Sequence, residues 1–290
     1  MSIGSRFIWS ADGQPVAIGV DCLGRGPVVL MLPAPSSVST RAELRPLAEA
    51  LAHGLELVIP DWPGFGDADG PAVAWSPAHL QAFLRAFVTE RLTPPFAVLA
   101  AGHAAAYALD LAAAQAGSIT RIALVAPTWR GPLPTVAGGY RRWQDRVRRT
   151  VQAPLLGPVL YRLNVNRPML RMMLRGHVLA HPENLTTELL SAKAAVTRRR
   201  NARFASAAFV TGGLDLVHDR DAFLDLARRA AVPILAAWGP QTPPRSRAEM
   251  EALADMDGVR TVLLPAGALG VHEEWAHEVA AAVGPFLSQP

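Results

Sequence analysis

The chain has 290 residues, of which 50% are hydrophobic, so it is long and apolar enough to bury a large core and is not a disordered protein. A single cysteine, Cys22, excludes an internal disulfide framework and a cysteine-rich metal site, and favours a reducing compartment. The net charge of +4 is unevenly spread, because residues 136–210 carry 13 Arg and one Lys against three acids, a net charge of +11 that leaves −7 elsewhere. This asymmetry indicates a charged surface for a partner.

Apolar runs and helical patterns alternate along the chain. In order, the expected elements are a hairpin over 6–23, a strand over 27–33, a helix over 39–52, a strand over 55–60, a helix over 76–92, a strand over 95–101 that turns sharply into a helix ending near 114, a strand over 121–127, a helix over 219–230, a strand over 233–238, a helix over 247–256, a strand over 260–266 and a helix over 271–287. The first of these helices, 39–52, has Ser39 or Thr40 as its N-cap and Glu43 in its first turn. The alternation predicts a mostly parallel sheet with helices on both faces.

The alternation breaks between residues 133 and 217. This segment is Arg-rich and helical without a convincing strand, so we interpret it as a cap inserted into a core formed by residues 1–132 and 218–290. The chain has no signal-peptide pattern and no uninterrupted apolar run of about 18 residues, so neither a leader nor a membrane span is predicted.

Five short motifs occur in an order that resembles the α/β-hydrolase fold. They are VVLMLPAPSS (28–37), IPDWPGFGDAD (59–69), AAGHAAA (100–106), AAWGPQT (236–242) and LPAGALGVHEEW (264–275). The resemblance is to the capped branch of the superfamily, which includes epoxide hydrolases, dehalogenases and carbon–carbon bond hydrolases. It implies an α/β fold with a mostly parallel, eight-stranded α/β-hydrolase sheet, helices on both faces and an inserted helical cap.

The same motifs depart from the family's catalytic triad. In the family pattern G-x-S-x-G a nucleophile occupies the centre of the turn between strand and helix, but here that residue is Ala104, flanked by the small Gly102 and Ala106. A methyl group cannot attack a substrate, so covalent catalysis from this position is excluded. The position that matches the triad acid is Thr242, whereas His272 matches the triad histidine. The triad is therefore degenerate, with His272 as the candidate base.

The residues expected around this site are also unusual. One oxyanion donor of the family comes from a loop that has Pro35 at the matching position, and proline has no N–H; a shift of one residue would place Ala34 or Ser36 there. The second donor, the N–H of Ala105, is expected to remain. His103, at the variable position of the turn, is typical of a side chain that packs against the sheet. The residues predicted to line the ligand pocket are Pro35, Ser36, His103, Ala105 and Trp129.

Two classes of function fit this pattern. The first, which we favour, is a non-hydrolytic binding or accessory protein for an apolar ligand held between sheet and cap. The second is an enzyme in which His272 acts as a general base without a covalent intermediate, as in lyases or cofactor-free oxygenases that resemble this fold, or a residual hydrolase of hydrophobic small molecules. The second class needs a carboxylate that orients His272. Asp61 is a remote candidate but more often caps a turn, and Glu273 and Glu274 point away because adjacent helical side chains diverge.

The basic segment gives the clearest sign of a partner. Residues 153–179 combine Leu, Met, Val and Tyr with regularly spaced Arg and no acid. This composition fits a cap that covers the core with its apolar side, or a surface that contacts a lipid-like ligand, an anionic membrane or a protein partner. No nucleic acid is expected, since no nucleic-acid-binding fold accompanies the charge. The dispersed His residues and the loop GFGDADG predict neither a metal site nor a nucleotide cofactor. We expect a cytoplasmic or membrane-peripheral protein.

Overall fold

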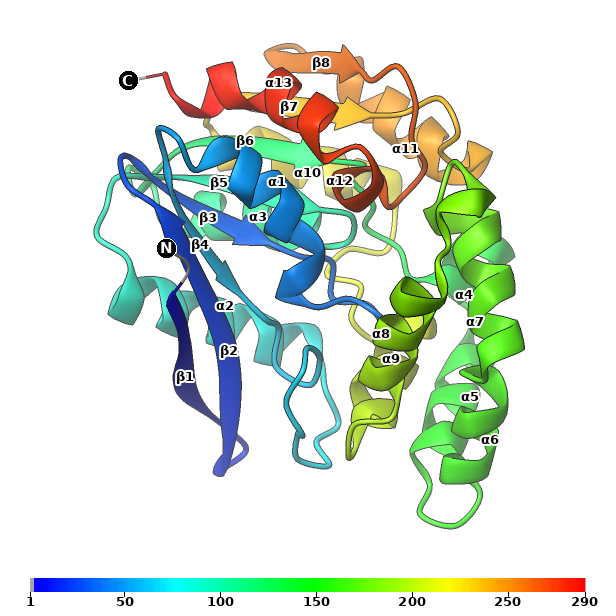
Figure 1. Cartoon of the computed structure of the whole chain (residues 1–290). Helices are drawn as coiled ribbons and strands as arrows, with labels where there is room; N and C mark the ends of the chain where they lie inside the picture. The colour runs from blue at the N-terminus through cyan, green and yellow to red at the C-terminus, as the bar shows by residue number, and fades with distance from the viewer. Residues whose placement is uncertain (1–2, 290) are drawn as a thin grey trace.

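An eight-stranded sheet forms the centre of the molecule. The computed structural model describes residues 3–289, and its strands lie in the order β1-β2-β4-β3-β5-β6-β7-β8 (Figure 1). The strands are β1 (Ile3–Ala11), β2 (Gln14–Gly24), β3 (Val28–Leu32), β4 (Glu56–Pro60), β5 (Phe96–Ala101), β6 (Ile119–Val125), β7 (Ile234–Trp238) and β8 (Val259–Leu263). β2 pairs antiparallel with β1 and with β4, and all other neighbours are parallel. The predicted mostly parallel, eight-stranded sheet is confirmed.

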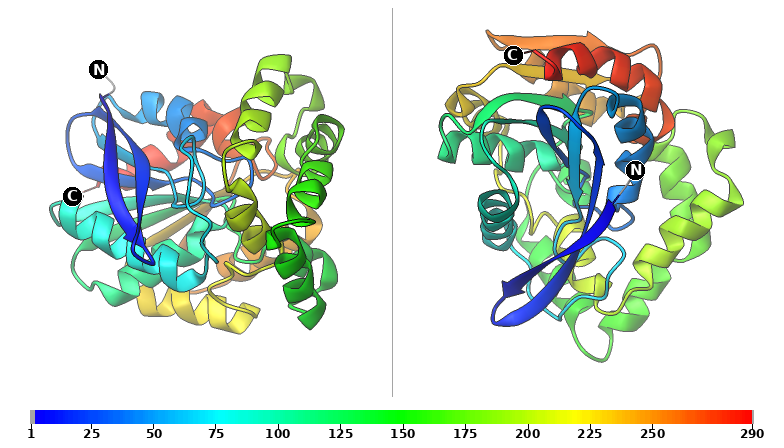
Figure 2. Two further views of the ribbon diagram at one scale, coloured as in Figure 1. Left: turned by 90° about the horizontal axis from the view of Figure 1, so that it is seen from below. Right: turned by 60° about the vertical axis from the view of Figure 1, so that its left-hand side comes forward.

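Helices cover both faces of this sheet (Figures 1 and 2). On one face lie α1 (Arg45–Leu51) and α13 (Ala276–Leu287), which pack against each other. On the other face lie α2 (Pro77–Arg91), α3 (Ala104–Ala114), α10 (Arg220–Ala230) and α11 (Pro244–Ala254). Strands between two helical layers must be apolar on both sides, and every residue of β5 is buried accordingly. The carboxyl ends of β3, β5, β6 and β7 therefore meet at one edge, where the loops that carry the site begin.

All helices of the Arg-rich segment lie between β6 and α10 in the chain. They are α4 (Pro132–Ala137), α5 (Arg142–Gln152), α6 (Gly157–Asn164), α7 (Arg167–Met173), α8 (Thr187–Thr197) and α9 (Ala202–Val210), with short turns η2 (Leu174–Val178) and η3 (Pro182–Asn184). Together they form a layer beside the sheet (Figure 1), and the segment 133–217, all of which is described, contains no strand. We call this layer the cap. Within residues 3–289 no helix has the length and hydropathy needed to cross a membrane.

Two expected helices are interrupted, and the interruptions shape the site. The helix expected over 39–52 begins instead with a tight turn, η1 (Arg41–Leu44), whose N-cap Thr40 accepts a hydrogen bond from the Ala42 N–H, and continues as α1. The helix expected over 271–287 breaks at Trp275 into a short α12 (Val271–Glu274) and α13. η1 and α12 pack against each other. Side chains from the starts of both predicted helices thereby become neighbours.

Candidate functional site

The turn between β5 and α3 keeps a residue with left-handed backbone at the junction of strand and helix, but that residue is Gly102 and not Ala104. The residue with left-handed backbone is Gly102, with φ of 52°, and a glycine adopts this conformation without strain. Ala104 is the first residue of α3 and is fully buried. A Cβ atom added to Gly102 would lie 3.2 Å from the Cβ of Ala34, so the loop after β3 is in close contact with the turn. Ala104, which the sequence motif places at the centre of the turn, is therefore a buried methyl group at the start of α3, and Gly102, at the left-handed position, has no side chain.

The expected oxyanion donors are used within the protein. The N–H of Ala105, which we expected to remain as a donor, is instead hydrogen-bonded to the carbonyl of Gly102 at 3.1 Å. This is a correction, and its reason is that the turn closes on itself before α3 begins. In the other loop, Pro35 has no N–H, and the N–H of Ser36 donates to the Ala34 carbonyl at 2.8 Å. The N–H groups of Ala105 and Ser36 are therefore both used within the protein.

Thr242, the residue that the sequence motif matches to the triad acid, closes a turn of the backbone. Thr242 is buried, and its hydroxyl donates to the carbonyl of Gly239 at 2.8 Å, which closes the loop after β7. In the loop after β6, the backbone N–H of Thr128 donates to the Gly102 carbonyl at 3.0 Å and ties that loop to the turn after β5. In both loops that could supply a triad acid, the threonine therefore forms a hydrogen bond to a nearby backbone carbonyl and not to His272.

His272 lies in a buried group of charged side chains that spans core and cap. Its Nε2 atom is 3.3 Å from Oε1 of Glu43 on η1. The other carboxylate oxygen of Glu43 is 3.3 Å from Nζ of Lys193 on α8 of the cap, and the same ammonium group lies 2.8 Å from Glu273 on α12. Nδ1 of His272 is buried and makes no hydrogen bond. We call these four residues the charged cluster.

The electrostatics of the charged cluster favour full ionisation of the Glu43–Lys193 pair. Burial by itself would raise the pKa of Glu43, but the positive charge of Lys193 and the nearby His272 and Ser39 outweigh burial and lower that pKa to about 2. Burial would lower the pKa of Lys193, but Glu43 and Glu273 together raise it above its ordinary value. The pair therefore stays charged at neutral pH and connects the cap to the core.

Sequence reasoning missed two members of this cluster. Glu43 was expected in the first turn of a helix, and nothing in its local pattern indicates that it approaches His272. Lys193 could have been singled out from the sequence, because it is the only lysine in a chain with 27 arginines. A compact ammonium can contact two carboxylates in a confined space, which the larger planar guanidinium does less readily. The expectation that Glu273 does not pair with His272 agrees with the structure, where Glu273 contacts Lys193.

Asp61 belongs to a separate ion-pair group. Its carboxylate accepts a hydrogen bond from the backbone N–H of Arg41 at 2.7 Å and also pairs with the Arg41 guanidinium. The same guanidinium contacts Asp21 and Asp67, at 3.0 and 2.9 Å. Burial raises the pKa of Asp61 to about 6, despite the opposing effect of Arg41. Asp61 thus holds the start of η1 in place through Arg41 and belongs to a different ion-pair group from His272.

His103 is a buried packing residue. Its ring meets that of Phe209 edge-on, with centroids 5.6 Å apart, and its Nε2 atom is 3.2 Å from the carbonyl of Leu214. Nε2 also lies 3.5 Å from the carboxylate of Asp215. Burial lowers the pKa of His103 to about 4 and raises the pKa of Asp215 to about 7. At neutral pH His103 is therefore uncharged, and the assignment of its N–H to Nε2 follows from the carbonyl acceptor.

The loop after β3 is tightly packed against the cap. Val38, in the loop after β3, joins an apolar cluster of cap side chains from α7, α8 and η2: Leu170, Leu174, Leu190 and Ala194. Nearby, the hydroxyl of Ser37 is hydrogen-bonded to that of Ser206 on α9 at 2.6 Å. A pocket lined by these two serines and by residues 64–70 and 196–202 has a volume of only about 10 Å³, room for about one water molecule.

A larger pocket, of about 380 Å³, lies between the loop after β6 and α11. Of the five residues predicted to contact a ligand, Trp129 lines this pocket, whereas Pro35, Ser36, His103 and Ala105 line neither of the two pockets. His272 lines neither as well. Among residues 3–289 no group of three or more metal-ligating side chains forms a metal site.

Solved structures with this fold are enzymes of several kinds. A bromoperoxidase from Bacillus anthracis aligns with a TM-score of 0.74 at 14% identity, over 98% of this chain and 100% of that one. The Cif epoxide hydrolase from Acinetobacter nosocomialis aligns with a TM-score of 0.74 at 17% identity, over 98% and 89%. A loop variant of a haloalkane dehalogenase from Bradyrhizobium elkanii aligns with a TM-score of 0.71 at 18% identity, over 99% and 97%. These similarities are too distant to transfer an activity, and they establish the fold.

A search among curated proteins found no significant match. A sequence model of one family does match, over residues 29–282, and its description is the alpha/beta hydrolase family. The match includes the turn at Ala104, the loop at Thr242 and the segment at His272, in the order expected from the motifs. This chain belongs to the alpha/beta hydrolase family.

Proposed function

We propose that this protein is a non-hydrolytic member of the family that binds apolar, lipid-like molecules at an anionic membrane surface through its cap. The observation that carries the proposal is the distribution of exposed apolar side chains. Among the described residues 3–289, 13 large hydrophobic residues are highly exposed; 11 of them lie in residues 136–172, and the other two are Ile8 and Leu263. Soluble monomers rarely leave so many large apolar side chains together on one surface.

The non-hydrolytic part of the proposal rests on the site. Ala104 offers no nucleophile, and the turn around it is buried and internally hydrogen-bonded. His272 is close to Glu43, in a cluster whose charges hold the cap against the core. Two further observations support a non-hydrolytic role: the N–H groups of Ala105 and Ser36 are used within the protein, and Ala104 and His272 line neither of the two pockets.

Helix α6 presents its apolar side to solvent rather than to the core. Leu156, Val159, Leu160 and Leu163 are spaced i, i+3, i+4 and i+7, which places them on one face of the helix, and they are 40–65% exposed. In the preceding loop Leu155 is 87% exposed. An amphipathic helix that covers a core has the opposite orientation, so this stripe suits contact with an apolar phase outside the protein.

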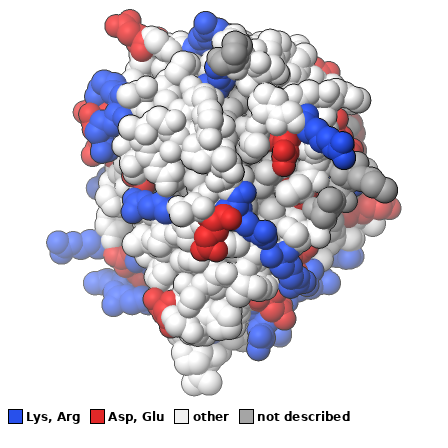
Figure 3. Space-filling view, turned by 90° about the vertical axis from the view of Figure 1, so that its left-hand side faces the viewer, with Lys and Arg blue, Asp and Glu red and all other residues white. Residues whose placement is uncertain are grey.

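Positive charge accompanies the exposed stripe. Arginines exposed on α5, α6 and α7 flank it: Arg142, Arg146, Arg149, Arg162, Arg167 and Arg171. On the face of the molecule away from the cap, basic and acidic side chains are interspersed among uncharged ones (Figure 3). Each basic side chain near an anionic membrane contributes about 1 kcal/mol of attraction, and each Leu buried in the interface contributes about 2 kcal/mol. The two effects combined favour an anionic lipid surface over a neutral one.

Co-sedimentation with lipid vesicles tests this proposal. We expect the protein to bind vesicles of phosphatidylcholine and phosphatidylserine, to bind pure phosphatidylcholine much less, and to dissociate at high salt. Leu155→Ser combined with Leu163→Ser should weaken binding at least tenfold, because two exposed anchors are lost. The matched control is Leu263→Ser, since Leu263 is 69% exposed on β8, outside the cap, and its replacement should leave binding unchanged.

Two outcomes would contradict the proposal. If anionic vesicles do not bind the protein, or if Leu263→Ser weakens binding as much as the cap variant, the cap is not a membrane surface. Self-association of the protein that depends on Leu155 and Leu163, without vesicle binding, would assign the same surface to a protein partner instead.

One observation favours the alternative function. Glu43 supplies a carboxylate beside His272, the partner that a histidine general base needs for a fixed tautomer, and Nδ1 of His272 has no hydrogen bond. Turnover of an ester panel by the wild-type protein that is lost in His272→Gln would support catalysis and overturn the non-hydrolytic proposal. We expect no turnover by either protein, together with unchanged vesicle binding by His272→Gln.

A further inference from the structure

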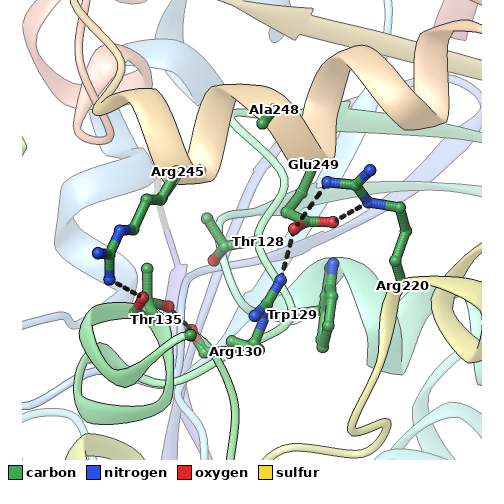
Figure 4. Close-up of a pocket in the computed structure, with 10 residues that line it drawn as sticks. Thr128, Trp129, Arg130, Thr135, Arg220, Arg245, Ala248 and Glu249 are labelled. Atoms are coloured by element: carbon green, nitrogen blue, oxygen red, sulfur yellow. Dashed lines mark hydrogen bonds and ion pairs between the residues drawn. The ribbon is translucent and has the colours of Figure 1, made fainter.

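The pocket of about 380 Å³ is lined by residues that take no part in the proposed membrane contact. It is lined by residues of the loop after β6 and of α4, by Arg220 at the start of α10, and by residues 245–249 of α11 (Figure 4). Its volume lies in the range of small-molecule sites. The Ala104 turn and the charged cluster contribute no residue to its lining. It is therefore a separate candidate site on the same domain.

Three arginines and one glutamate give the pocket an excess of positive charge. Arg220 contacts both carboxylate oxygens of Glu249, at 2.8 and 3.2 Å, and Arg130 pairs with the same carboxylate. Arg245 makes no contact with Glu249 and donates instead to the backbone carbonyl of Thr135 at 2.8 Å. One carboxylate is thus shared between the guanidinium groups of Arg130 and Arg220, and with Arg245 the pocket has a net charge of +2.

A buried hydrogen-bond donor on the pocket wall has no acceptor. Trp129 is only 1% exposed, and its Nε1–H makes no hydrogen bond. The ring is fixed between the guanidinium of Arg130, 4.2 Å from its centroid, and the stacked ring of Phe223, 5.9 Å away. Figure 4 shows Nε1 directed to the side of the pocket where Glu249 and Arg220 lie. A buried donor without an acceptor is costly to the fold, so an acceptor from a ligand would relieve a real deficit.

We propose that this pocket binds a small organic anion, whose carboxylate or phosphate oxygen accepts the hydrogen bond of Trp129 Nε1–H. Arg220 and Arg245 lie at the exposed rim and attract the anion, since guanidinium groups bind carboxylate and phosphate through paired N–H donors. The body of the ligand lies along Thr128, Thr135 and Ala248 on the walls.

Titrations followed by NMR of ¹⁵N-labelled indole groups test this proposal on the full chain. The probes are benzoate, phenyl phosphate, inorganic phosphate and the neutral benzamide. Trp129→Phe identifies the Trp129 resonance by its loss and removes the donor while it keeps an aromatic ring. Trp75→Phe is the matched control, because Trp75 also has a buried Nε1 without a partner but does not line this pocket.

We expect benzoate or phenyl phosphate to shift the Trp129 N–H resonance, with affinity that falls as salt is added. Trp129→Phe should weaken binding at least tenfold, as expected when a hydrogen bond to a charged group is lost, and Trp75→Phe should not change it. Arg245→Gln, at the exposed rim, provides a second test that does not disturb the core and should also weaken binding. Inorganic phosphate that binds as tightly as phenyl phosphate would identify a free anion as the ligand, and tighter binding of the aromatic probes would identify an organic acid.

The proposal is overturned by any of three results. These are no shift of the Trp129 resonance with any anion, equal binding of benzamide and benzoate, or anion affinity that Trp129→Phe and Arg245→Gln leave unchanged.

Discussion

Replacement of Lys193 by methionine tests whether the charged cluster connects the cap to the core. Lys193 and Glu43 are both buried, with side chains 8% and 4% exposed, so the change leaves a buried carboxylate without its main counter-charge. Removal of one partner of such a pair costs about 3–5 kcal/mol. His272 remains 3.3 Å from Glu43 in this variant, so we expect the lower value. About 3 kcal/mol corresponds to a fall in melting temperature of about 6–12 °C.

Thermal and urea unfolding of Lys193→Met, measured with matched variants, provide the assay. Arg228→Met is the surface control, because Arg228 is 61% exposed in its pair with Asp225, and it should change the free energy of unfolding by less than about 0.5 kcal/mol. Glu43→Gln in the Lys193→Met background removes the unpaired charge and should recover most of the loss. A Lys193→Met protein as stable as Arg228→Met, or a double variant less stable than Lys193→Met alone, would refute the reasoning.

The pH dependence gives an independent check of the same cluster. The folded-state pKa of Glu43 is about 2, below its ordinary value of 4.5. A carboxylate with a lowered pKa stabilises the fold above its unfolded-state pKa, and this contribution is lost as the pH falls through the folded-state value. In Lys193→Met burial raises the pKa of Glu43 instead, so the difference in stability between wild type and this variant should begin to shrink above pH 4.5 and continue to shrink down to about pH 2.

Two further predictions follow from other buried residues. Ala104→Ser should not react with a fluorophosphonate probe, because residue 104 is fully buried at the start of α3 and the Ala105 N–H is already hydrogen-bonded; labelled protein would contradict this account of the site. Burial raises the pKa of Asp215 from 3.8 to about 7, so its contribution to stability is lost as the pH rises through that window. Asp215→Asn keeps an oxygen that accepts the hydrogen bond of the Gly131 N–H. Its free energy of unfolding in urea, relative to wild type, should rise by up to about 4 kcal/mol between pH 4 and pH 8. Parallel pH profiles of the two proteins would contradict the raised pKa of Asp215.

Much of the fold could be predicted from the sequence because its strands are short apolar runs between turn residues. Segments such as 95–101 and 233–238 are apolar throughout, which is how a strand covered on both faces reads, and both are strands in the structure. The boundaries of two helices were wrong, at η1 and at Trp275. Both breaks depend on the packing of η1 against α12, a contact between distant parts of the chain that no local pattern records.

The sequence by itself determined which chemistry the family position lacks, since Ala104 and Thr242 have no nucleophile and no carboxylate whatever their surroundings. Only the tertiary structure decided what replaced it. Glu43 and Lys193 are 150 positions apart, and they meet because the cap folds back over the loop after β3. Likewise, the spacing of apolar residues on α6 defines a stripe, but the direction in which the stripe points depends on the neighbours of the helix. Periodicity fixes which side chains share a face, and packing alone decides whether that face is buried or open to solvent.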